Sequence, residues 1–292
     1  MPIQILPAEN SKSAPHARPL PHNNSAQNTP GNSSAMARPA QPNPFQAQRN
    51  LVEKNLENVN KVIAIHSGKG GVGKSFFAVN LAASLAQSGF KAGLIDADVD
   101  CPSCHKLLGQ TARAMADENQ RLQPLESHGI KFLSVGNMVD NENSAQIMRG
   151  PIMFKLISEM LYKANWGTLD YLIIDLPPGT GDNPLTIMQI APLEGMIVVT
   201  QPQEVALVDA RKSADMAKRM DIPVLGIVEN MSGDVFGSGG AEAAAKTLEV
   251  KFLGSIPLQK NIRELSDRGI PPVIEDKSLL ALFEGISENA GL

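Results

Sequence analysis

A glycine-rich segment at residues 67–76 has the residue types and spacing that bind a phosphate chain. It reads Ser-Gly-Lys-Gly-Gly-Val-Gly-Lys-Ser-Phe, which satisfies the pattern G-x-x-x-x-G-K-[ST]. Glycines let successive backbone N–H groups turn inward around phosphates, and the N-terminus of the following helix adds partial positive charge. In this pattern Lys74 reaches the β- and γ-phosphates, and the Ser75 hydroxyl ligates Mg²⁺. The segment predicts a nucleotide site formed by Gly68, Lys69, Gly70, Gly71, Val72, Gly73, Lys74, Ser75 and Phe76.

Two further segments place carboxylates at the ends of apolar runs. Asp96, Asp98 and Asp100 alternate at the end of the apolar run that begins at residue 92, and Asp175 ends the run at 171–175. Beside a phosphate loop, such carboxylates hold Mg²⁺ through water or position the attacking water, although a solvated acidic loop explains residues 96–100 equally well. Asp175 is in the position of a Mg²⁺-water ligand. The Leu-Pro-Pro-Gly-Thr-Gly-Asp sequence at 176–182 suits neither a helix nor a central strand, and it predicts a loop that responds to the γ-phosphate.

The elements that must position these residues alternate between short apolar runs and longer amphipathic ones. We expect strands at 62–66, 92–97, 130–135, 171–175, 196–200, 224–229 and 251–255. We expect helices at 74–87, 151–164, 184–190, 206–220, 241–248 and 278–289. Strands rich in Val and Ile that are separated by helices predict an α/β domain, with a mostly parallel sheet covered by helices on both faces. Ligands of such sheets bind at the carboxyl ends of the strands, where the phosphate loop follows the first strand.

The first fifty residues differ from the rest of the chain in composition. They contain nine prolines, seven asparagines and four basic residues, with Glu9 as their only acidic residue. Such a stretch buries too little apolar surface to offset the entropy of ordering it, so we expect residues 1–50 to be a disordered tail and 51–292 to be the folded domain. The whole chain has a net charge of −4, so the domain itself is acidic, which argues against nonspecific nucleic-acid binding. No run is long enough for a membrane span, no secretory signal is present, and two cysteines fit a reducing cytoplasm.

The extra lysine at 69 makes the phosphate loop resemble the deviant phosphate loop of the MinD/ParA class of ATPases. The resemblance implies a P-loop NTPase fold and an ATP-dependent homodimer in which Lys69 reaches the partner's nucleotide and stabilises charge on the transferred phosphoryl group. The Asp-x-Asp ending at Asp96 and Asp98 is similar to the second motif of that class. There the second aspartate orients the water, which assigns Asp98 that role and leaves Asp96 as the alternative.

Several further segments narrow the resemblance to the Mrp-type iron–sulfur cluster carrier ATPases. They include the Pro-Pro-Gly-Thr-Gly-Asp loop at 177–182, Pro-Gln-Glu-Val-Ala-Leu at 202–207, Glu-Asn-Met-Ser at 229–232 and Gly-Ser-Ile-Pro-Leu at 254–258. The resemblance covers about residues 55–275 and implies adenine contacts from Asn230 and Pro257. Two departures stand out: Phe76 replaces a small hydroxyl residue, and the family's Cys-x-x-Cys after the Asn-Met-Ser segment is absent.

The only cysteines, Cys101 and Cys104, form a Cys-x-x-Cys pair directly after the Asp-rich segment. This spacing suits one edge of a metal or cluster site, with a [4Fe-4S] cluster shared between two subunits as the fullest form of that hypothesis. The alternative is that both are small, partly buried residues of a loop. Nearby aspartates disfavour redox chemistry, because they raise thiol pKa values. We do not expect covalent haem attachment, because it needs export and the sequence shows no export signal.

Together these features predict a cytoplasmic, homodimeric and slow Mg²⁺-dependent ATPase that resembles iron–sulfur cluster carriers, with ATP and Mg²⁺ as cofactors and apo iron–sulfur proteins as clients. The alternative is a MinD/ParA-like positioning or regulatory switch that carries no cluster, which the missing family cysteines favour.

Overall fold

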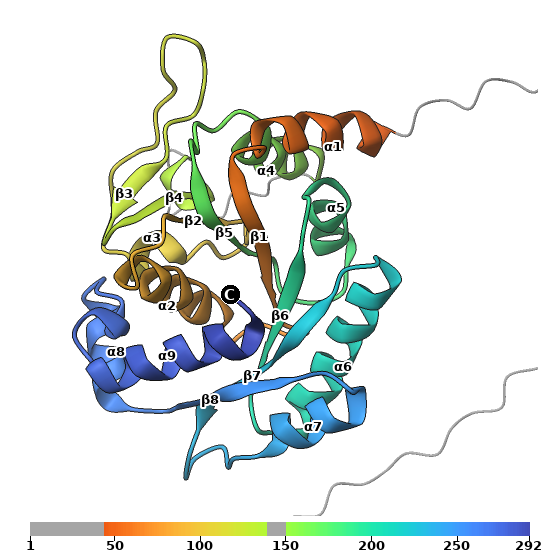
Figure 1. The fold of residues 1–292 in the computed structure, drawn as a ribbon, viewed down its shortest axis with the longest axis vertical. Coiled ribbons are helices and arrows are strands. Elements are labelled where there is room, and N and C mark those ends of the chain that lie inside the picture. The colour runs from red at the N-terminus through yellow and green to blue at the C-terminus, as the bar shows by residue number, and fades with distance from the viewer. Residues whose placement is uncertain (1–43, 139–149) are drawn as a thin grey trace, which may run out of the picture. The chain divides into compact units, whose positions relative to one another are not determined.

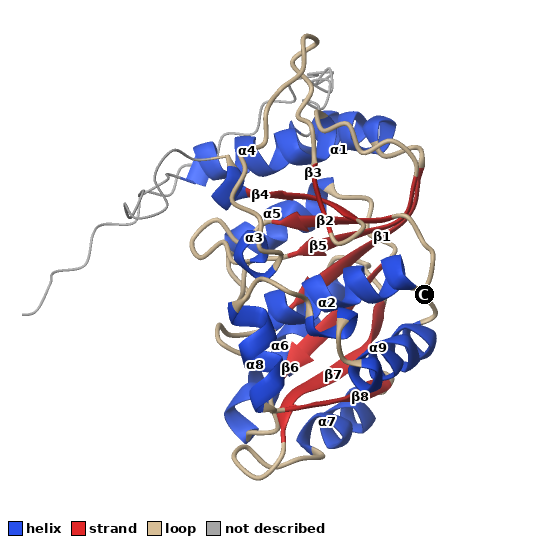
Figure 2. Ribbon diagram, turned by 90° about the vertical axis from the view of Figure 1, so that its left-hand side faces the viewer, coloured by secondary structure: helices blue, strands red, loops and turns tan. Residues whose placement is uncertain are grey.

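The computed structural model describes residues 44–138 and 150–292. In this part of the chain, eight strands form one sheet, and helices lie on both of its faces (Figures 1 and 2). The strands are β1 (Val59–His66), β2 (Ala92–Asp96), β3 (Leu125–Ser127), β4 (Ile130–Ser134), β5 (Leu169–Asp175), β6 (Gly195–Thr200), β7 (Val224–Ser232) and β8 (Phe252–Pro257). The α-helices are α1 (Pro44–Asn55), α2 (Lys74–Gln87), α3 (Cys104–Leu107), α4 (Gly150–Tyr162), α5 (Asp182–Ile190), α6 (Glu204–Arg219), α7 (Gly240–Leu248), α8 (Lys260–Asp267) and α9 (Lys277–Ala290). Two short 3₁₀ turns are η1 (Val135–Asn137) and η2 (Pro272–Ile274).

The strand order is β3-β4-β2-β5-β1-β6-β7-β8, and only β3 runs antiparallel to its neighbour. The expected α/β class with a mostly parallel sheet is therefore confirmed. Strand β5 is inserted between β1 and β2, so Asp175 pairs in register with both Ile65 and Asp96. Because these strands are parallel, the phosphate loop after β1, the Asp-rich loop after β2 and the loop after β5 all leave the same edge of the sheet.

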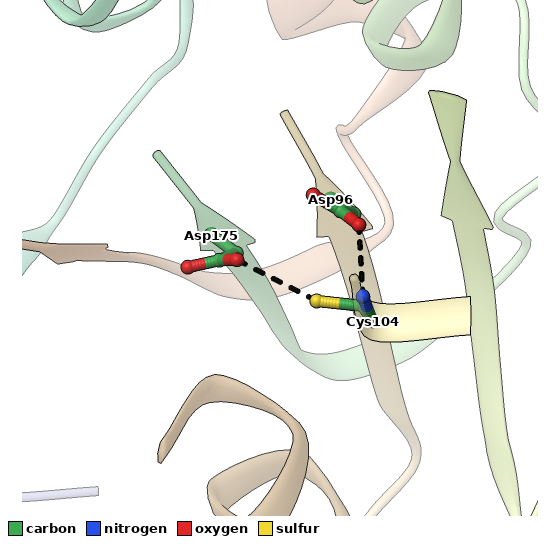
Figure 3. Close-up of side chains that lie close together, drawn as sticks. All are labelled: Asp96, Cys104 and Asp175. Atoms are coloured by element: carbon green, nitrogen blue, oxygen red, sulfur yellow. Dashed lines mark hydrogen bonds between the residues drawn. The ribbon is translucent and has the colours of Figure 1, made fainter. Parts of the chain in front are cut away.

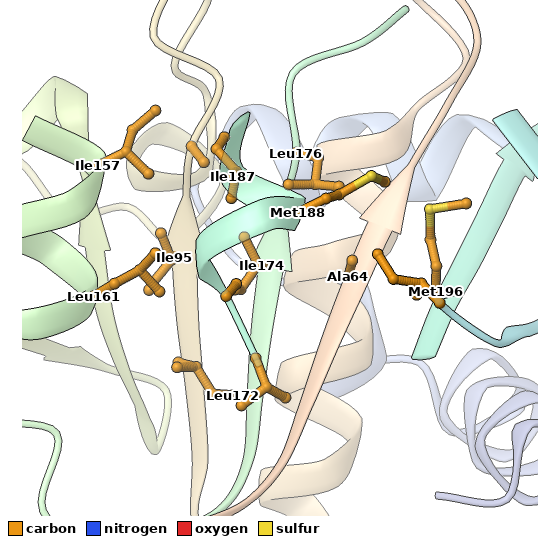
Figure 4. Close-up of a cluster of buried hydrophobic side chains, with 14 of the residues drawn as sticks. Ala64, Ile95, Ile157, Leu161, Leu172, Ile174, Leu176, Ile187, Met188 and Met196 are labelled. Carbon is orange, nitrogen blue, oxygen red and sulfur yellow. The ribbon is translucent and has the colours of Figure 1, made fainter. Parts of the chain in front are cut away.

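Alternating side chains of the central strands divide the interior into two apolar layers. Val62 and Ala64 of β1 point into the layer covered by α1, α4, α5, α6 and α7, part of which is shown in Figure 4. Ile63 and Ile65 point into the opposite layer, which is covered by α2, α3 and α9. Since both faces are covered, the strands are apolar at nearly every position, which is why their sequences predicted a buried parallel sheet.

The phosphate loop rests on a tightly packed helix. Phe77 of α2 is fully buried and stacks on Phe283 of α9, with ring centroids 5.5 Å apart. Phe76 also contacts Phe283, edge to face, at a centroid distance of 6.4 Å. Aromatic pairs at these distances add to the burial energy and fix the helix axis. The N-terminus of α2, where the loop ends, is therefore held in place from its apolar side.

The boundary of the N-terminal tail differs from the expectation. Residues 1–43 lie outside the described part of the chain, but residues 44–50, which we expected in the tail, begin helix α1. Val52 of this helix and Leu56 just after it are buried in the core, and Phe45 meets Phe154 of α4 edge to face at 6.0 Å. The polar composition of residues 44–50 hid this helix, because it has only one narrow apolar stripe.

All thirteen strands and helices expected from the sequence are present, with ends shifted by a few residues. The elements that were not expected are α1, α3, β3, α8 and the two 3₁₀ turns, each short or mostly polar. Among the helices that the structure describes, none is both long and apolar enough to cross a lipid bilayer.

Candidate functional site

The phosphate loop connects the end of β1 to the start of α2. Gly73 is the residue just before the helix, and it has a left-handed backbone with φ +83°. A side chain there would be strained, and its Cβ would overlap the Asn230 amide, so both the turn and the close approach require glycine. Gly70 and Gly71 are exposed, Val72 is buried and Gly68 lies against Asp209 of α6. The loop thus has its glycine backbone toward solvent and its one apolar side chain toward the core.

A cavity of about 980 Å³ opens beside this loop. Its walls come from the phosphate loop, from the Asp-rich segment after β2 and from the loop after β5, with the end of α8 completing one side. Lys74, Ser75, Phe76 and Asp98 all face it. The volume is at the upper end of the range for small-molecule sites, which suits a ligand as large as a nucleotide.

Lys74 is buried at the base of the cavity among carboxylates. Its Nζ lies 2.6 Å from Oδ1 of Asp175 and 4.0 Å from Oδ2 of Asp98, and only 6% of its side chain is exposed. Burial alone would lower the pKa of Lys74, but the charges of Asp175 and Asp98 outweigh it and raise the pKa above its usual value. Lys74 is therefore a fixed cation at the point where the phosphate loop meets the sheet.

Asp96 supports the loop that carries Asp98. Its carboxylate accepts hydrogen bonds from the backbone N–H groups of Asp98, Ser103 and Cys104, at 3.0–3.2 Å, and from the Ser134 hydroxyl at 2.9 Å. It is fully buried, and burial, reinforced by the charge of Asp175, raises its pKa to about 7. Because all these bonds come from the protein itself, Asp96 holds the loop from the side opposite the cavity.

Asp98 is placed differently, at the cavity wall. Its Oδ1 accepts a 3.3 Å hydrogen bond from the Cys101 N–H, and its Oδ2 is the atom nearest Lys74. Burial raises the pKa of Asp98, and the positive charge of Lys74 opposes that rise. Of the two carboxylates considered for orienting water, the structure places Asp98 at the cavity and Asp96 away from it.

The two cysteines lie in different environments. Cys101 is exposed at the cavity rim, whereas Cys104 is fully buried, and its thiol donates to Oδ2 of Asp175 at 3.5 Å (Figure 3). Burial raises the pKa of the Cys104 thiol well above its usual value, and the charges of Asp96 and Asp175 raise it further. Asp96, Cys104 and Asp175 bring three possible ligand atoms within 4.8 Å of one another, but Lys74 and the loop backbone already use the carboxylates. This arrangement gives no support to a cluster site on Cys101 and Cys104.

Asn230 and Gln201 hold the phosphate loop from the far side. The Asn230 amide donates to the Val72 carbonyl at 2.8 Å, and the Gln201 amide donates to the Gly71 carbonyl at 3.3 Å. The sequence singled out Asn230, but it contained no signal for Gln201 at the end of β6. Pro257 ends β8 and pairs with Ser232 of β7. This bond uses one N–H of the Asn230 amide, which has a second N–H and the acceptor Oδ1 besides.

Lys69 is half-buried in the phosphate loop, and it makes no ion pair with any residue in the described ranges.

The turn at 233–237 follows the Asn-Met-Ser segment, the place where Mrp-type proteins have their Cys-x-x-Cys. It is closed by two backbone hydrogen bonds between Gly233 and Gly237. Val235 at its tip is 73% exposed.

The sequence matches one family model and several proteins of known name. The model of the family described as ParA, NUBPL iron-transfer P-loop NTPase, matches residues 58–289. The iron–sulfur cluster carrier protein of Synechocystis sp. is 45% identical over an alignment of 262 residues, and the match covers 82% of this chain and 74% of that protein. The protein of the same name from Methanocaldococcus jannaschii is 46% identical over an alignment of 237 residues, and the match covers 77% of this chain and 82% of that one.

Solved structures give the same result for the fold. A nucleotide-binding protein from Archaeoglobus fulgidus, in complex with ADP, matches with a TM-score of 0.68 and 35% identity, covering 78% of this chain and 94% of that one. The cell division ATPase MinD of Pyrococcus furiosus matches with a TM-score of 0.63, covering 79% of this chain and 99% of that one. Its identity is 24%, so this second likeness shows the fold alone.

Proposed function

This chain belongs to the ParA family of P-loop NTPases, among the iron–sulfur cluster carrier proteins, and from that premise we propose that it binds and slowly hydrolyses ATP as a homodimer to carry iron–sulfur clusters. The observation that carries the proposal is the meeting of Lys74 and Asp98 at one cavity, with Asp175 directly behind Lys74. A structural loop has no need of a buried lysine among carboxylates at the base of such a cavity.

ATP binding begins, in this proposal, with an exchange of partners at Lys74. When no nucleotide is bound, Lys74 forms a 2.6 Å ion pair with Asp175. The β- and γ-phosphates carry more charge and stand in front of the loop N–H groups, so Lys74 turns to them. The exchange leaves the Asp175 carboxylate available.

The residues at the loop fit a Mg²⁺ ion. Ser75 lines the cavity and offers a hydroxyl oxygen, and Asp175 offers a carboxylate that would hold a Mg²⁺-bound water. Hard oxygen ligands of this kind are the ones that Mg²⁺ prefers. When bound, Mg²⁺ supplies positive charge that offsets the charge on the phosphates.

Asp98 is the residue that we propose orients the attacking water. It lies at the cavity wall, and burial makes its carboxylate a better proton acceptor than an exposed aspartate. Lys69, which has no ion-pair partner in the described chain, completes the partner subunit's site across a dimer interface. Turnover is slow because hydrolysis in this class times a conformational cycle.

The cargo in this proposal is an iron–sulfur cluster, and the clients are apo iron–sulfur proteins. Support comes from the relatives that are named iron–sulfur cluster carrier proteins. Both cysteines are free, as a reducing cytoplasm keeps them. A cluster on these thiols requires Cys104 to leave Asp175 and turn outward, and a four-thiolate site requires two chains.

A second function is favoured by the burial of Cys104. With one accessible thiol, and no cysteine in the turn at 233–237, the chain matches an ATP-driven switch that carries no cluster. Counting iron and acid-labile sulfide after anaerobic reconstitution separates the two functions. Carriage through this pair predicts iron in the native protein and a loss of iron in both Cys101→Ser and Cys104→Ser, whereas no iron in any of the three supports the switch.

The nucleotide part of the proposal is tested with two lysine variants. Lys74→Met should abolish binding of a fluorescent ATP analogue, because the phosphates lose their direct counter-ion. Lys69→Met should bind the analogue nearly as well as the native protein, but it should lose nucleotide-dependent dimerisation measured by light scattering, along with turnover. Equal loss of binding in both variants would make Lys69 a local phosphate ligand and refute the dimer role.

A further inference from the structure

His66, the last residue of β1, is buried directly before the phosphate loop. Its side chain is fully inaccessible, and strand alternation puts it on the same face of the sheet as Val62 and Ala64. The ring Nε2 lies 2.8 Å from the carbonyl oxygen of Gly179 in the loop after β5. A carbonyl only accepts, so Nε2 carries the proton and donates. Burial lowers the pKa of His66 to about 4, so the ring is neutral near pH 7.

The other ring nitrogen is left unsatisfied by the residues that the structure describes. Within the described residues, Nδ1 of His66 is buried and makes no hydrogen bond. An unsatisfied buried acceptor is costly, and an apolar side chain of similar size would fill the same space without that cost. Packing alone therefore does not account for a histidine at this position, whereas its one hydrogen bond to Gly179 does.

Gly179 is the point where the loop after β5 is fastened to the phosphate loop. Its N–H donates to the Ser67 carbonyl at 2.8 Å, so Gly179 is held through both its N–H and its carbonyl. The two residues before it are prolines, which have no N–H to donate. Before them, Leu176 N–H donates to Ile65 at 3.0 Å, which leaves Gly179 as the next backbone anchor along the loop.

The loop after β5 passes from buried to exposed residues at Gly179. Pro177 is buried and Gly179 is half-buried, whereas residues 180–183 are exposed, and Gly181, Asp182 and Asn183 line the nucleotide cavity. Gly179 itself has a left-handed backbone, with φ +86°. Pro177 and Pro178 also line the cavity, and the exposed part of this loop extends beyond them from a pivot whose position depends on Ser67 and His66.

We propose that His66 is a positioning residue for the nucleotide reaction, which acts through its hydrogen bond to Gly179 to hold the 180–183 segment over the phosphate loop. This inference rests on the proposed ATPase function. His66 does not touch the phosphates: it fixes the distance between the two loops that surround them, so its loss should slow the chemical step and leave nucleotide affinity nearly unchanged.

The test compares His66→Met with His66→Gln in the full-length protein. The two side chains have similar length and volume, but only Gln keeps an N–H at the position of Nε2. His66→Met should lower kcat by about three- to tenfold, the factor that one net hydrogen bond is worth, with ADP affinity within about twofold. His66→Gln should restore most of kcat. Equal loss of kcat in both variants, or native kcat in His66→Met, would overturn the proposal.

Hydrogen exchange at the Gly179 amide separates this inference from the proposed function. The amide should exchange about three- to tenfold faster in His66→Met than in the native protein and at nearly the native rate in His66→Gln. If the native protein hydrolyses no ATP, the proposed function fails, and this exchange still decides whether His66 holds the loop. Unchanged exchange in His66→Met would refute the role of His66 and leave the ATPase standing.

A measurement on the native protein covers the case in which His66→Met does not fold. With ¹⁵N-labelled histidine at pH 7, the ring of His66 should carry its proton on Nε2 alone, and this N–H should exchange slowly and shift when ADP and Mg²⁺ are added. A proton on Nδ1, or a resonance that nucleotide does not move, would overturn the proposal.

Discussion

Replacing Lys74 with Met should destabilise the protein in the absence of any nucleotide. Lys74 is the counter-ion of three buried carboxylates, those of Asp96, Asp98 and Asp175. Its Nζ is 2.6 Å from Asp175 and 4.0 Å from Asp98. Met fills nearly the same volume, so the change removes charge with little change in packing. The buried carboxylates then face one another without a counter-ion.

The size of the effect follows from the burial of the pair. Asp175 is fully buried and Lys74 is 6% exposed, and breaking a buried ion pair by removing one partner costs about 3–5 kcal/mol. For a domain of this size, that corresponds to a fall in Tm of roughly 10 °C.

The loss of stability in Lys74→Met should also depend on pH. Lys74 lowers the pKa of Asp96, so its removal raises that pKa above the native value of about 7. The folded variant then holds a proton that the native protein has lost, and the penalty grows above pH 7 by up to ~1.4 kcal/mol per pH unit.

The assay is urea denaturation without nucleotide, at pH 6 and pH 8. The matched control is Lys69→Met, which makes the same change in the same loop at a residue that has no ion pair in the described structure. The control should change the free energy of unfolding by less than about 1 kcal/mol at both pH values. Native stability for Lys74→Met at pH 8, or a penalty equal to that of Lys69→Met, would refute the view of Lys74 as the counter-ion of a buried carboxylate group.

Three further predictions concern the carboxylates and thiols of the site. Asp98→Asn should slow phosphate release at saturating ATP with little change in KM, because Asp98 lies at the cavity wall, and native turnover in this variant would exclude it as the residue that orients water. Asp96→Asn should remove a pH dependence: between pH 4 and 7 the folded native protein holds a proton that the unfolded chain has lost, so its free energy of unfolding falls with rising pH relative to the variant, by up to ~1.4 kcal/mol per unit. Parallel curves in urea titrations would contradict the raised pKa. In the folded protein, iodoacetamide should label the exposed Cys101 and spare the buried Cys104, and ATP should slow the labelling; rapid labelling of both thiols, read by mass spectrometry, would mean that the loop opens.

The sequence was sufficient for the fold because the central strands carry their own signal. Apolar residues at consecutive positions in β1, β5 and β6 mark strands covered on both faces, and the glycine-rich loop marks the edge that binds ligand. It was insufficient for α1 and α8, since a helix with a narrow apolar stripe resembles a polar loop in sequence. Val52 and Leu56 could be recognised as core residues only once the sheet that they cover was known.

The site was predictable where local pattern determines chemistry and unpredictable where packing does. Lys74 and Asp175 follow from motifs, and the structure brings them into contact. The burial of Cys104 does not follow from its spacing to Cys101, because it depends on the α3 turn placing the thiol against Asp175. His66 also has no motif: its partner, Gly179, lies 113 residues away in sequence and meets it only because β1 and β5 are neighbours in the sheet.

Phosphate release from ATP is the measurement that tests the central claim most directly. With Mg²⁺ present, the native protein should release phosphate slowly, and chelation of the metal should stop the release. Lys74→Met, assayed at a temperature where it is shown to be folded, should release none. A native protein that binds no ATP at the cavity beside Lys74, or a folded Lys74→Met that releases phosphate at the native rate, would contradict the account.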